Sequence, residues 1–205
     1  MLSFAVIGAV SAQAITFNFS NVFSGDTPSG PPAWASLTIV NDGTVSGLNK
    51  VKFTLTNLTD PASGQFITEL LLNLTSIPSD FAFVTGSDTP SGRFTGDSHG
   101  SNFVNDAGEK FDYDATFNIP NNGKRVIGGT SVSWDVKGTG LDANHFLTFA
   151  TPQGDNPRDI YAMVHMQGLP NGGSAKLNGT VAVPEPTSMA ALGIAAVGLL
   201  RKRRK

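Results

Sequence analysis

The chain has 205 residues and no cysteine. That absence excludes disulfide frameworks, thiolate catalysis and cysteine-based zinc or iron–sulfur sites. Charged residues are also few, at 15%, and five of the fourteen Lys and Arg residues stand together at 201–205. Residues 15–183 hold nine Lys and Arg against fifteen Asp and Glu, which leaves a net charge of −6. An acidic body repels phosphate backbones, so we expect no nucleic-acid partner.

Long helix-forming stretches are scarce as well. The 23 Gly and 12 Pro residues are spread along the chain, which favours many short strands joined by turns. Apolar residues alternate with polar ones at 111–119, from Phe111 through Tyr113 to Phe117, which is the spacing of a half-buried strand. The other predicted strands cover residues 15–19, 36–40, 51–55, 66–74, 81–84, 132–136, 146–149, 161–166 and 175–183.

Turn-forming residues separate these strands, as in Asn-Asp-Gly at 41–43 and Asn-Asn-Gly at 121–123. Short strands with one apolar face each predict an all-β fold, an antiparallel, jelly-roll-like β-sandwich over residues 15–182. Residues 67–74 also suit a short helix because they include good helix formers, although their neighbours favour a strand. Residues 101–108 show no regular period and are predicted to form a loop.

The first fourteen residues have the pattern of a secretory signal peptide. Residues 2–10 are uncharged and predominantly apolar, and Ala12 and Ala14 place small side chains at the two positions that signal peptidase inspects. We expect a signal helix within 1–14, removed by signal peptidase before Ile15. The alternative is an apolar strand or short helix of the core, and the lack of Lys or Arg before the apolar run departs from the signal pattern.

Three features follow one another between residues 183 and 205. Pro184, Glu185 and Pro186 cannot join a helix or a sheet interior, so this motif stays extended and accessible to a protease. Residues 189–200 contain no polar side chain, which suits lipid. As a helix, residues 187–200 would rise about 21 Å, short of the roughly 30 Å hydrocarbon core. The cations that follow predict a cytoplasmic end and an external body: Arg201, Lys202, Arg203, Arg204 and Lys205.

This arrangement resembles the PEP-CTERM sorting signal, in which a Pro-Glu-Pro motif, an apolar helix and an Arg-rich end are recognised by exosortase, a transpeptidase-like membrane protease. The resemblance covers residues 183–205 and leaves the body unassigned. It implies a short apolar C-terminal helix that anchors the precursor transiently in the membrane, and processing near the Pro-Glu-Pro motif. It also implies a place at the cell surface or in the matrix beside extracellular polysaccharide. The alternatives are an ordinary membrane anchor and an apolar tail packed on the body.

Residues that could carry chemistry in the body are few. Residues 96–100 match G-x-S-x-G, the nucleophile-elbow pattern, but no helical pattern follows Ser98 as an elbow requires. The three histidines lack the spacing of paired metal ligands, and a partly buried His165 on a strand face is the simpler account. We therefore expect no catalytic residue, no bound metal and no cofactor. The histidines are His99, His145 and His165.

Two binding hypotheses remain for the body. Asp112 and Asp114 share a strand face and would bind calcium if a loop carboxylate joined them, the alternative being a solvated face. The loop carboxylates considered are Asp97, Asp106 and Asp142. Trp34 and Phe94 are the aromatic candidates for stacking on a sugar ring, although a lone Trp after two prolines favours the core.

These observations predict an exported, non-enzymatic surface or matrix protein associated with polysaccharide. A carbohydrate-binding module and a serine hydrolase that uses Ser98 are the alternatives. The predicted partners are exosortase and signal peptidase as processing enzymes, the membrane during sorting, and extracellular polysaccharide.

Overall fold

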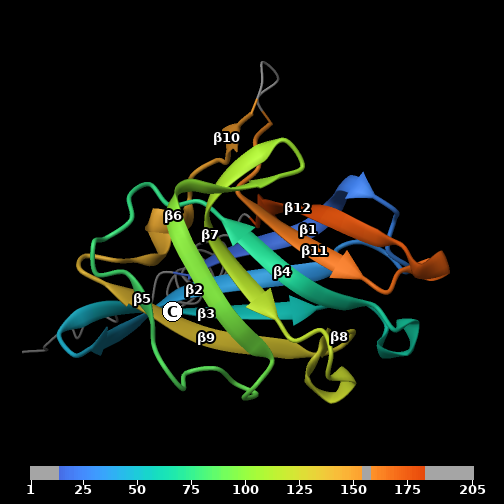
Figure 1. The fold of residues 1–205 in the computed structure, drawn as a ribbon, viewed down its shortest axis with the longest axis horizontal. Helices are drawn as coiled ribbons and strands as arrows, with labels where there is room; N and C mark the ends of the chain where they lie inside the picture. Colours follow the sequence, from blue (N-terminus) through green and yellow to red (C-terminus); the bar gives the residue numbers. More distant parts are fainter. Residues whose placement is uncertain (1–13, 154–157, 183–205) are drawn as a thin grey trace, which may run out of the picture.

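The computed structural model describes residues 14–153 and 158–182, which form twelve β-strands and four short 3-10 helices (Figure 1). The strands are β1 (Ala14–Gly25), β2 (Ala35–Val45), β3 (Leu48–Asn57), β4 (Phe66–Leu72), β5 (Ala82–Phe83), β6 (Phe94–Asp106), β7 (Glu109–Phe117), β8 (Val126–Ile127), β9 (Ser131–Gly138), β10 (Thr151–Pro152), β11 (Ala162–Gln167) and β12 (Ser174–Val181). The helices are η1 (Pro61–Ser63), η2 (Asn122–Lys124), η3 (Ala143–Phe146) and η4 (Pro170–Gly172). In these two ranges no helix is long and apolar enough to cross a membrane.

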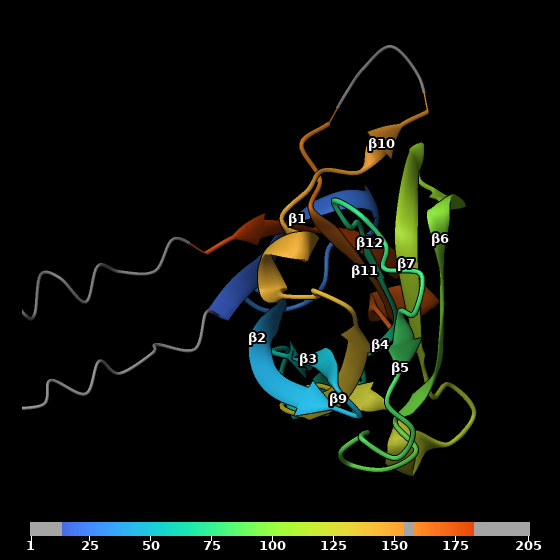
Figure 2. The same ribbon diagram turned by 90° about the vertical axis from the view of Figure 1, so that its left-hand side faces the viewer.

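All strands join one antiparallel sheet in the order β10-β7-β4-β11-β12-β1-β2-β3-β9-β5, with β6 beside β7 and β8 beside β4. The sheet bends over, so that β4, β7 and β6 lie on one side of the molecule and β2, β3 and β9 on the other (Figure 2). This arrangement encloses one main core between the two halves.

Aromatic side chains from the two halves meet in that core. The Phe53 ring on β3 stacks against Trp134 at 5.1 Å and against Tyr113 on β7 at 5.9 Å, measured between ring centroids. Trp134 Nε1 donates a hydrogen bond to the Tyr113 hydroxyl at 2.9 Å. Burial alternates strictly along β7, because successive side chains of a strand point to opposite faces. One face of β7 therefore belongs to the core and the other is available to form a site.

The structure confirms the predicted all-β, antiparallel and sandwich-like architecture. Of the ten predicted strands, nine appear, of which β1 and β2 extend several residues beyond their predicted ends, and the segment that also suited a helix is strand β4. The prediction of two packed sheets is corrected in one respect, since a single hydrogen-bonded sheet supplies both layers. The expected signal helix and apolar C-terminal helix lie outside the described residues, apart from Ala14, which begins β1.

Two predicted elements are wrong. Residues 146–149 were expected to form a strand, but η3 occupies residues 143–146. Asp142 and His145 form a capping box there, in which each side chain bonds the backbone N–H of the other residue, and this satisfies the N–H groups that begin a helix. Residues 101–108 were expected to form a loop, but most of them belong to β6. This edge strand shows no alternation because its outer half is exposed on both faces.

The turn between β2 and β3 also differs from its prediction. The Asn-Asp-Gly segment at 41–43 lies in an irregular part of β2 rather than at the turn. The reversal occurs at Ser46 and Gly47, whose φ values are 52° and 80°. Two consecutive positive φ values are the geometry of a type I′ hairpin turn, which suits the twist of the strands on either side.

Candidate functional site

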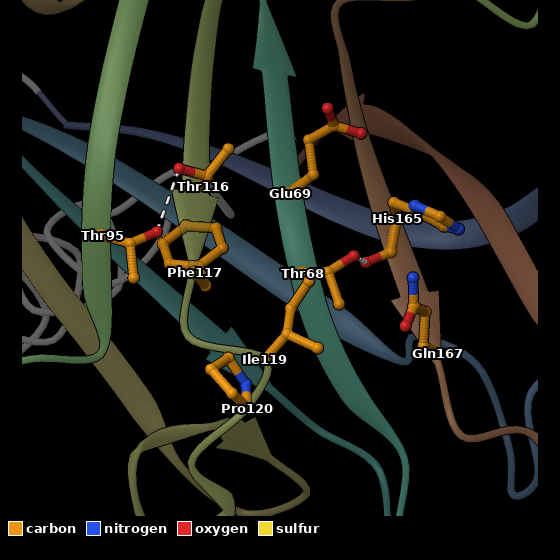
Figure 3. Close-up of a pocket in the computed structure, with 9 residues that line it drawn as sticks. All are labelled: Thr68, Glu69, Thr95, Thr116, Phe117, Ile119, Pro120, His165 and Gln167. Atoms are coloured by element: carbon orange, nitrogen blue, oxygen red, sulfur yellow. Dashed lines mark hydrogen bonds between the residues drawn. The ribbon is translucent and has the colours of Figure 1, made fainter.

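An open groove of about 400 Å³ crosses the outer face of the sheet at β7, β4 and β11 (Figure 3). The core lies behind this face and fixes the strands that carry the lining side chains. Concave sites of this size are typical of small-ligand binding. The residues that line the groove are Thr68, Glu69, Thr95, Thr116, Phe117, Ile119, Pro120, His165 and Gln167.

Strand pairing explains why side chains so far apart in sequence meet here. His165 on β11 pairs with Glu69 on β4, and Glu69 pairs with Thr116 on β7. Thr116 in turn pairs with Gly96 on β6. Directly opposed residues on neighbouring strands have Cβ atoms about 5 Å apart. His165, Glu69 and Thr116 therefore form a continuous polar floor across three strands, and the backbone of Gly96 on β6 borders it.

Hydrogen bonds orient the threonines of the groove. The Thr95 hydroxyl donates to Thr116 Oγ1 at 3.0 Å, and the Thr116 hydroxyl donates to the Gly96 carbonyl at 3.2 Å. Thr68 Oγ1 donates to the His165 carbonyl at 3.2 Å. Each hydroxyl keeps lone pairs that a ligand can use, since a hydroxyl has one donor and two acceptor sites.

One side of the groove is apolar. Ile119 is 43% exposed, an unusual fraction for a large aliphatic side chain, and Pro120 follows it. Figure 3 shows both residues beside the nearly buried Phe117 ring, whereas His165 and Gln167 lie on the far side. The groove thus offers a nonpolar surface facing a line of hydroxyl, imidazole, amide and carboxyl groups.

Burial sets the ionisation of the two titratable residues on the floor. Burial raises the pKa of the Glu69 carboxyl, and the negative charge of Asp114 raises it further, whereas Lys176 lowers it. Burial also lowers the pKa of His165, which favours the neutral imidazole. Lys176 is engaged by Asp106. The groove therefore has a negative or neutral character rather than a positive one.

A smaller hollow of about 130 Å³ adjoins the groove, and we call it the acidic hollow. It is lined by Gly96, Asp97, Ser98, Asp114 and Thr116, and Thr116 lines the groove as well. Burial raises the pKa of Asp97 and of Asp114, and the charge of Asp97 raises that of Asp114 further. The groove and the acidic hollow together form one polar surface that extends from β11 to β6.

The acidic hollow is linked to the core. The Tyr113 hydroxyl accepts the indole hydrogen bond of Trp134 and shares a hydrogen bond with the Asp97 carboxyl. Burial, and then the charge of Asp97, holds the pKa of Tyr113 well above its ordinary value, so the phenol keeps its proton and donates to Asp97. Core packing therefore fixes one wall of the acidic hollow.

The structure places Ser98 within strand β6 rather than at a strand-to-helix turn. Its neighbours in the acidic hollow are carboxylates and Thr116. The ring of the adjacent His99 packs against Phe81 at 4.8 Å. The elbow geometry that the G-x-S-x-G pattern requires is thus missing from β6.

The carboxylates considered for calcium are not brought together. Asp112 accepts the Leu74 and Asn102 backbone N–H groups, Asp106 pairs with Lys176 and Asp142 caps η3. Among residues 14–153 and 158–182, no three His, Asp or Glu side chains are placed to hold a metal ion. Only Asp97 and Asp114, of the residues considered, line a common hollow.

Both aromatic candidates for sugar stacking are corrected by their burial. Trp34 is 6% exposed and its indole N–H donates to the Gly30 carbonyl at 3.0 Å. Phe94 is 7% exposed and stacks on Trp134. Neither ring presents a face to a ligand, and they belong to the core that supports the sheet.

Sequence reasoning identified His165 and Asp114 but missed most of the groove. Glu69, Thr116 and Gln167 show no local motif, since their proximity arises from the register of β4, β7 and β11. The one available signal was the position of each on the polar face of its strand.

A comparison with protein families matches residues 182–205 to the PEP-CTERM protein-sorting motif. This match confirms the resemblance based on Pro184, Glu185, Pro186 and the basic residues that follow, all of which lie outside the described residues. The motif supports export and sorting by exosortase, from a precursor anchored in the membrane through its C-terminal part. Of the two small residues of the predicted signal-peptidase site, Ala12 lies outside the described residues, and Ala14, after which the cut was predicted, begins β1.

Neither the curated proteins nor the solved structures include a match to the chain.

Proposed function

We propose that this protein is a non-enzymatic component of the cell surface or extracellular matrix, and that its body binds extracellular polysaccharide in the groove. The composition of the groove is the observation that carries the proposal. Sugars present apolar C–H faces and rings of hydroxyl groups, and the groove offers Ile119 and Pro120 opposite a row of polar side chains. The sorting motif supports export, and the resemblance to exosortase substrates implies a place beside extracellular polysaccharide.

Binding without turnover is the simplest use of such a surface. The groove is open, so a polymer can lie across the strands without threading through the protein. The neutral imidazole of His165 and the amide of Gln167 both donate and accept hydrogen bonds, as the sugar hydroxyls require. Ser98 has no oriented histidine base in the contacts of β6 described above.

The binding claim is tested by co-sedimentation of the full chain with the extracellular polysaccharide of the producing bacterium. We expect the protein to sediment with the polymer and to leave its chain length unchanged. The paired substitution His165→Ala with Gln167→Ala should release it. Asn105→Ala, on an exposed position of β6 remote from the groove, should not. Retained binding by the paired variant, or shortening of the polymer, would count against the proposal.

We further infer that signal peptidase cuts before Ile15 and that exosortase cuts near Pro184-Glu185-Pro186, so that the mature protein lies at the cell surface. Mass spectrometry of both ends of the native protein tests this directly. An intact Lys205 in the surface fraction contradicts it. Replacing the Pro-Glu-Pro motif with three alanines should keep the protein in the membrane fraction with Lys205 present.

A further inference from the structure

Two carboxyl groups lie beside the junction between the groove and the acidic hollow: Glu69 on β4 and Asp114 on β7. Asp114 lies opposite Leu71, two residues beyond Glu69, so both side chains point to the outer face of the sheet. Asp97 on β6 lies opposite the buried Ala115, so its carboxyl points to the core face, where it bonds Tyr113. Fixed strands therefore hold two acidic groups within one binding surface.

These groups are not neutralised inside the protein. Within residues 14–153 and 158–182, neither of the two has a Lys, Arg or His nitrogen within ion-pair distance. Lys176, which influences Glu69, is engaged by Asp106. The groove and the acidic hollow therefore carry negative charge that no cation of the described residues pairs with.

Electrostatics determines which sugars such a surface accepts. A polymer of uronic acids or sulfated sugars would bring further negative charge beside carboxylates that already repel one another, and in a partly buried site this costs more than in water. A protonated amine would relieve that repulsion and form charge-assisted hydrogen bonds, which are stronger than neutral ones. Sugars whose only polar groups are amides and hydroxyls would gain only neutral hydrogen bonds.

We propose that the groove and acidic hollow select an amino-sugar polymer with free amines, whose ammonium groups bind at Glu69 and Asp114 while its sugar rings pack against Ile119 and Pro120. This inference rests on the proposed polysaccharide binding and names its ligand class.

The pH dependence of binding follows from the groups that act on these carboxyls. The charges of Asp114 and Lys176 act on Glu69, and the charge of Asp97 acts on Asp114. Burial raises the pKa of both carboxyls, so they protonate at higher pH than free carboxyls do. Affinity for the amine polymer should therefore fall on acidification and also at alkaline pH, where the ligand amine loses its proton.

The test compares three oligosaccharides of equal length on the full chain by calorimetry at low salt: glucosamine, N-acetylglucosamine and galacturonate oligomers. We expect the glucosamine oligomer to bind at least about tenfold more tightly than its acetylated form, as one charge-assisted hydrogen bond allows, and galacturonate not to bind. This comparison needs no variant, so a folding defect cannot explain it.

Variants then assign the effect to residues. Glu69→Gln and Asp114→Asn should each weaken glucosamine binding about tenfold, so that the preference for glucosamine over N-acetylglucosamine falls by that factor. Asp159→Asn removes an exposed carboxylate six residues before His165 along the chain and should change neither. Thermal unfolding of each variant checks that it is folded.

The outcomes separate this inference from the function on which it rests. Equal binding of the glucosamine and N-acetylglucosamine oligomers, lost in the paired His165 and Gln167 variant, overturns the amine preference and retains polysaccharide binding. Galacturonate binding that appears only with added calcium also overturns it, in favour of a cation-bridged acidic polymer. Failure of all three oligomers and of the native polysaccharide to bind overturns both.

Discussion

The buried Asn57 side chain offers a sharp test of how the sheet is held together beneath the groove. It is fully inaccessible to solvent and lies at the end of β3. Its Nδ2 donates to the Gln65 carbonyl at 3.1 Å and to the Val126 carbonyl at 3.0 Å. Its Oδ1 accepts from the Thr59 N–H at 3.1 Å and from the Thr59 hydroxyl at 2.8 Å. One amide thus joins β3 to the segments that begin β4 and β8.

The substitution Asn57→Ala removes all four hydrogen bonds. The Gln65 carbonyl keeps the Gly128 N–H at 3.2 Å, so the loss falls on the Val126 carbonyl and on the N–H and hydroxyl of Thr59. A buried group left unpaired costs about 1–3 kcal/mol, and the lower limit for each of these three gives a loss of about 3 kcal/mol. That is a large share of the 5–15 kcal/mol typical of a domain. The substitution Asn57→Asp should be worse above about pH 4, because an ionised carboxyl would face two carbonyl oxygens.

Equilibrium denaturant unfolding of the full chain, followed by tryptophan fluorescence, measures this loss. Asn105→Ala is the matched control, since its exposed amide on β6 makes no such bonds within the described ranges, and it should change stability by less than about 0.5 kcal/mol. A loss below about 1 kcal/mol for Asn57→Ala, with an unchanged denaturant slope, would refute the reasoning that these bonds anchor β4.

Three further predictions use the same unfolding assay. Tyr113→Phe should cost about 1–3 kcal/mol, because Trp134 Nε1 loses its acceptor in the core; a neutral result contradicts the assigned bond. Gly128→Ala should lower the free energy of unfolding by about 1–3 kcal/mol, because the added Cβ would lie 2.5 Å from the Asp60 carbonyl oxygen. If the variant is as stable as the wild type, the backbone at Gly128 is not tightly packed. Glu69→Gln should stabilise the protein at neutral pH, because burial raises the pKa of Glu69 in the folded state, so stability falls as pH rises from the unfolded pKa through the folded pKa. The gain should vanish near pH 3, where both states are protonated; a gain that persists there assigns it to another cause.

The strands that could be predicted are those with one buried face. On β7 and β3 every second side chain enters the core, and that constraint imposes a period of two on the sequence. On β6 the constraint is absent beyond His99, because the strand is at the edge and its outer half contacts solvent on both faces. Backbone pairing with β7 makes it a strand, and backbone pairing imposes no residue pattern.

The error at Phe146 has a different origin. Its apolar neighbours Leu147 and Phe149 favoured a strand, but Phe146 is buried edge-on against Phe53 while Phe149 is 44% exposed. The local signal was the Asp142 and His145 capping box, a pair three residues apart that starts a helix. A short-range hydrogen-bonding pattern here outweighs hydrophobicity.

The sorting motif could be recognised from the sequence alone, whereas the groove could not. The motif is a contiguous stretch whose order of features carries its meaning, so it could be recognised without the fold, and the family match agrees. The groove joins residues of β4, β6, β7 and β11 that only strand register brings together. No spacing within one segment marks Glu69 or Thr116 as neighbours.

The sheet also determines how the groove lies relative to the anchor of the precursor. The Ala182 N–H donates to the Thr16 carbonyl at 2.7 Å, so the body ends beside the first strand, and β1 begins and β12 ends on the same side of the molecule (Figure 2). Lys176 pairs with His165 and therefore lies level with the polar floor of the groove. It precedes Val181 by five residues, which span about 17 Å of extended strand. The strands that carry the groove lie on the other side (Figure 2). A membrane anchor attached after residue 182 therefore leaves the groove open, and polysaccharide binding should not depend on cleavage by exosortase.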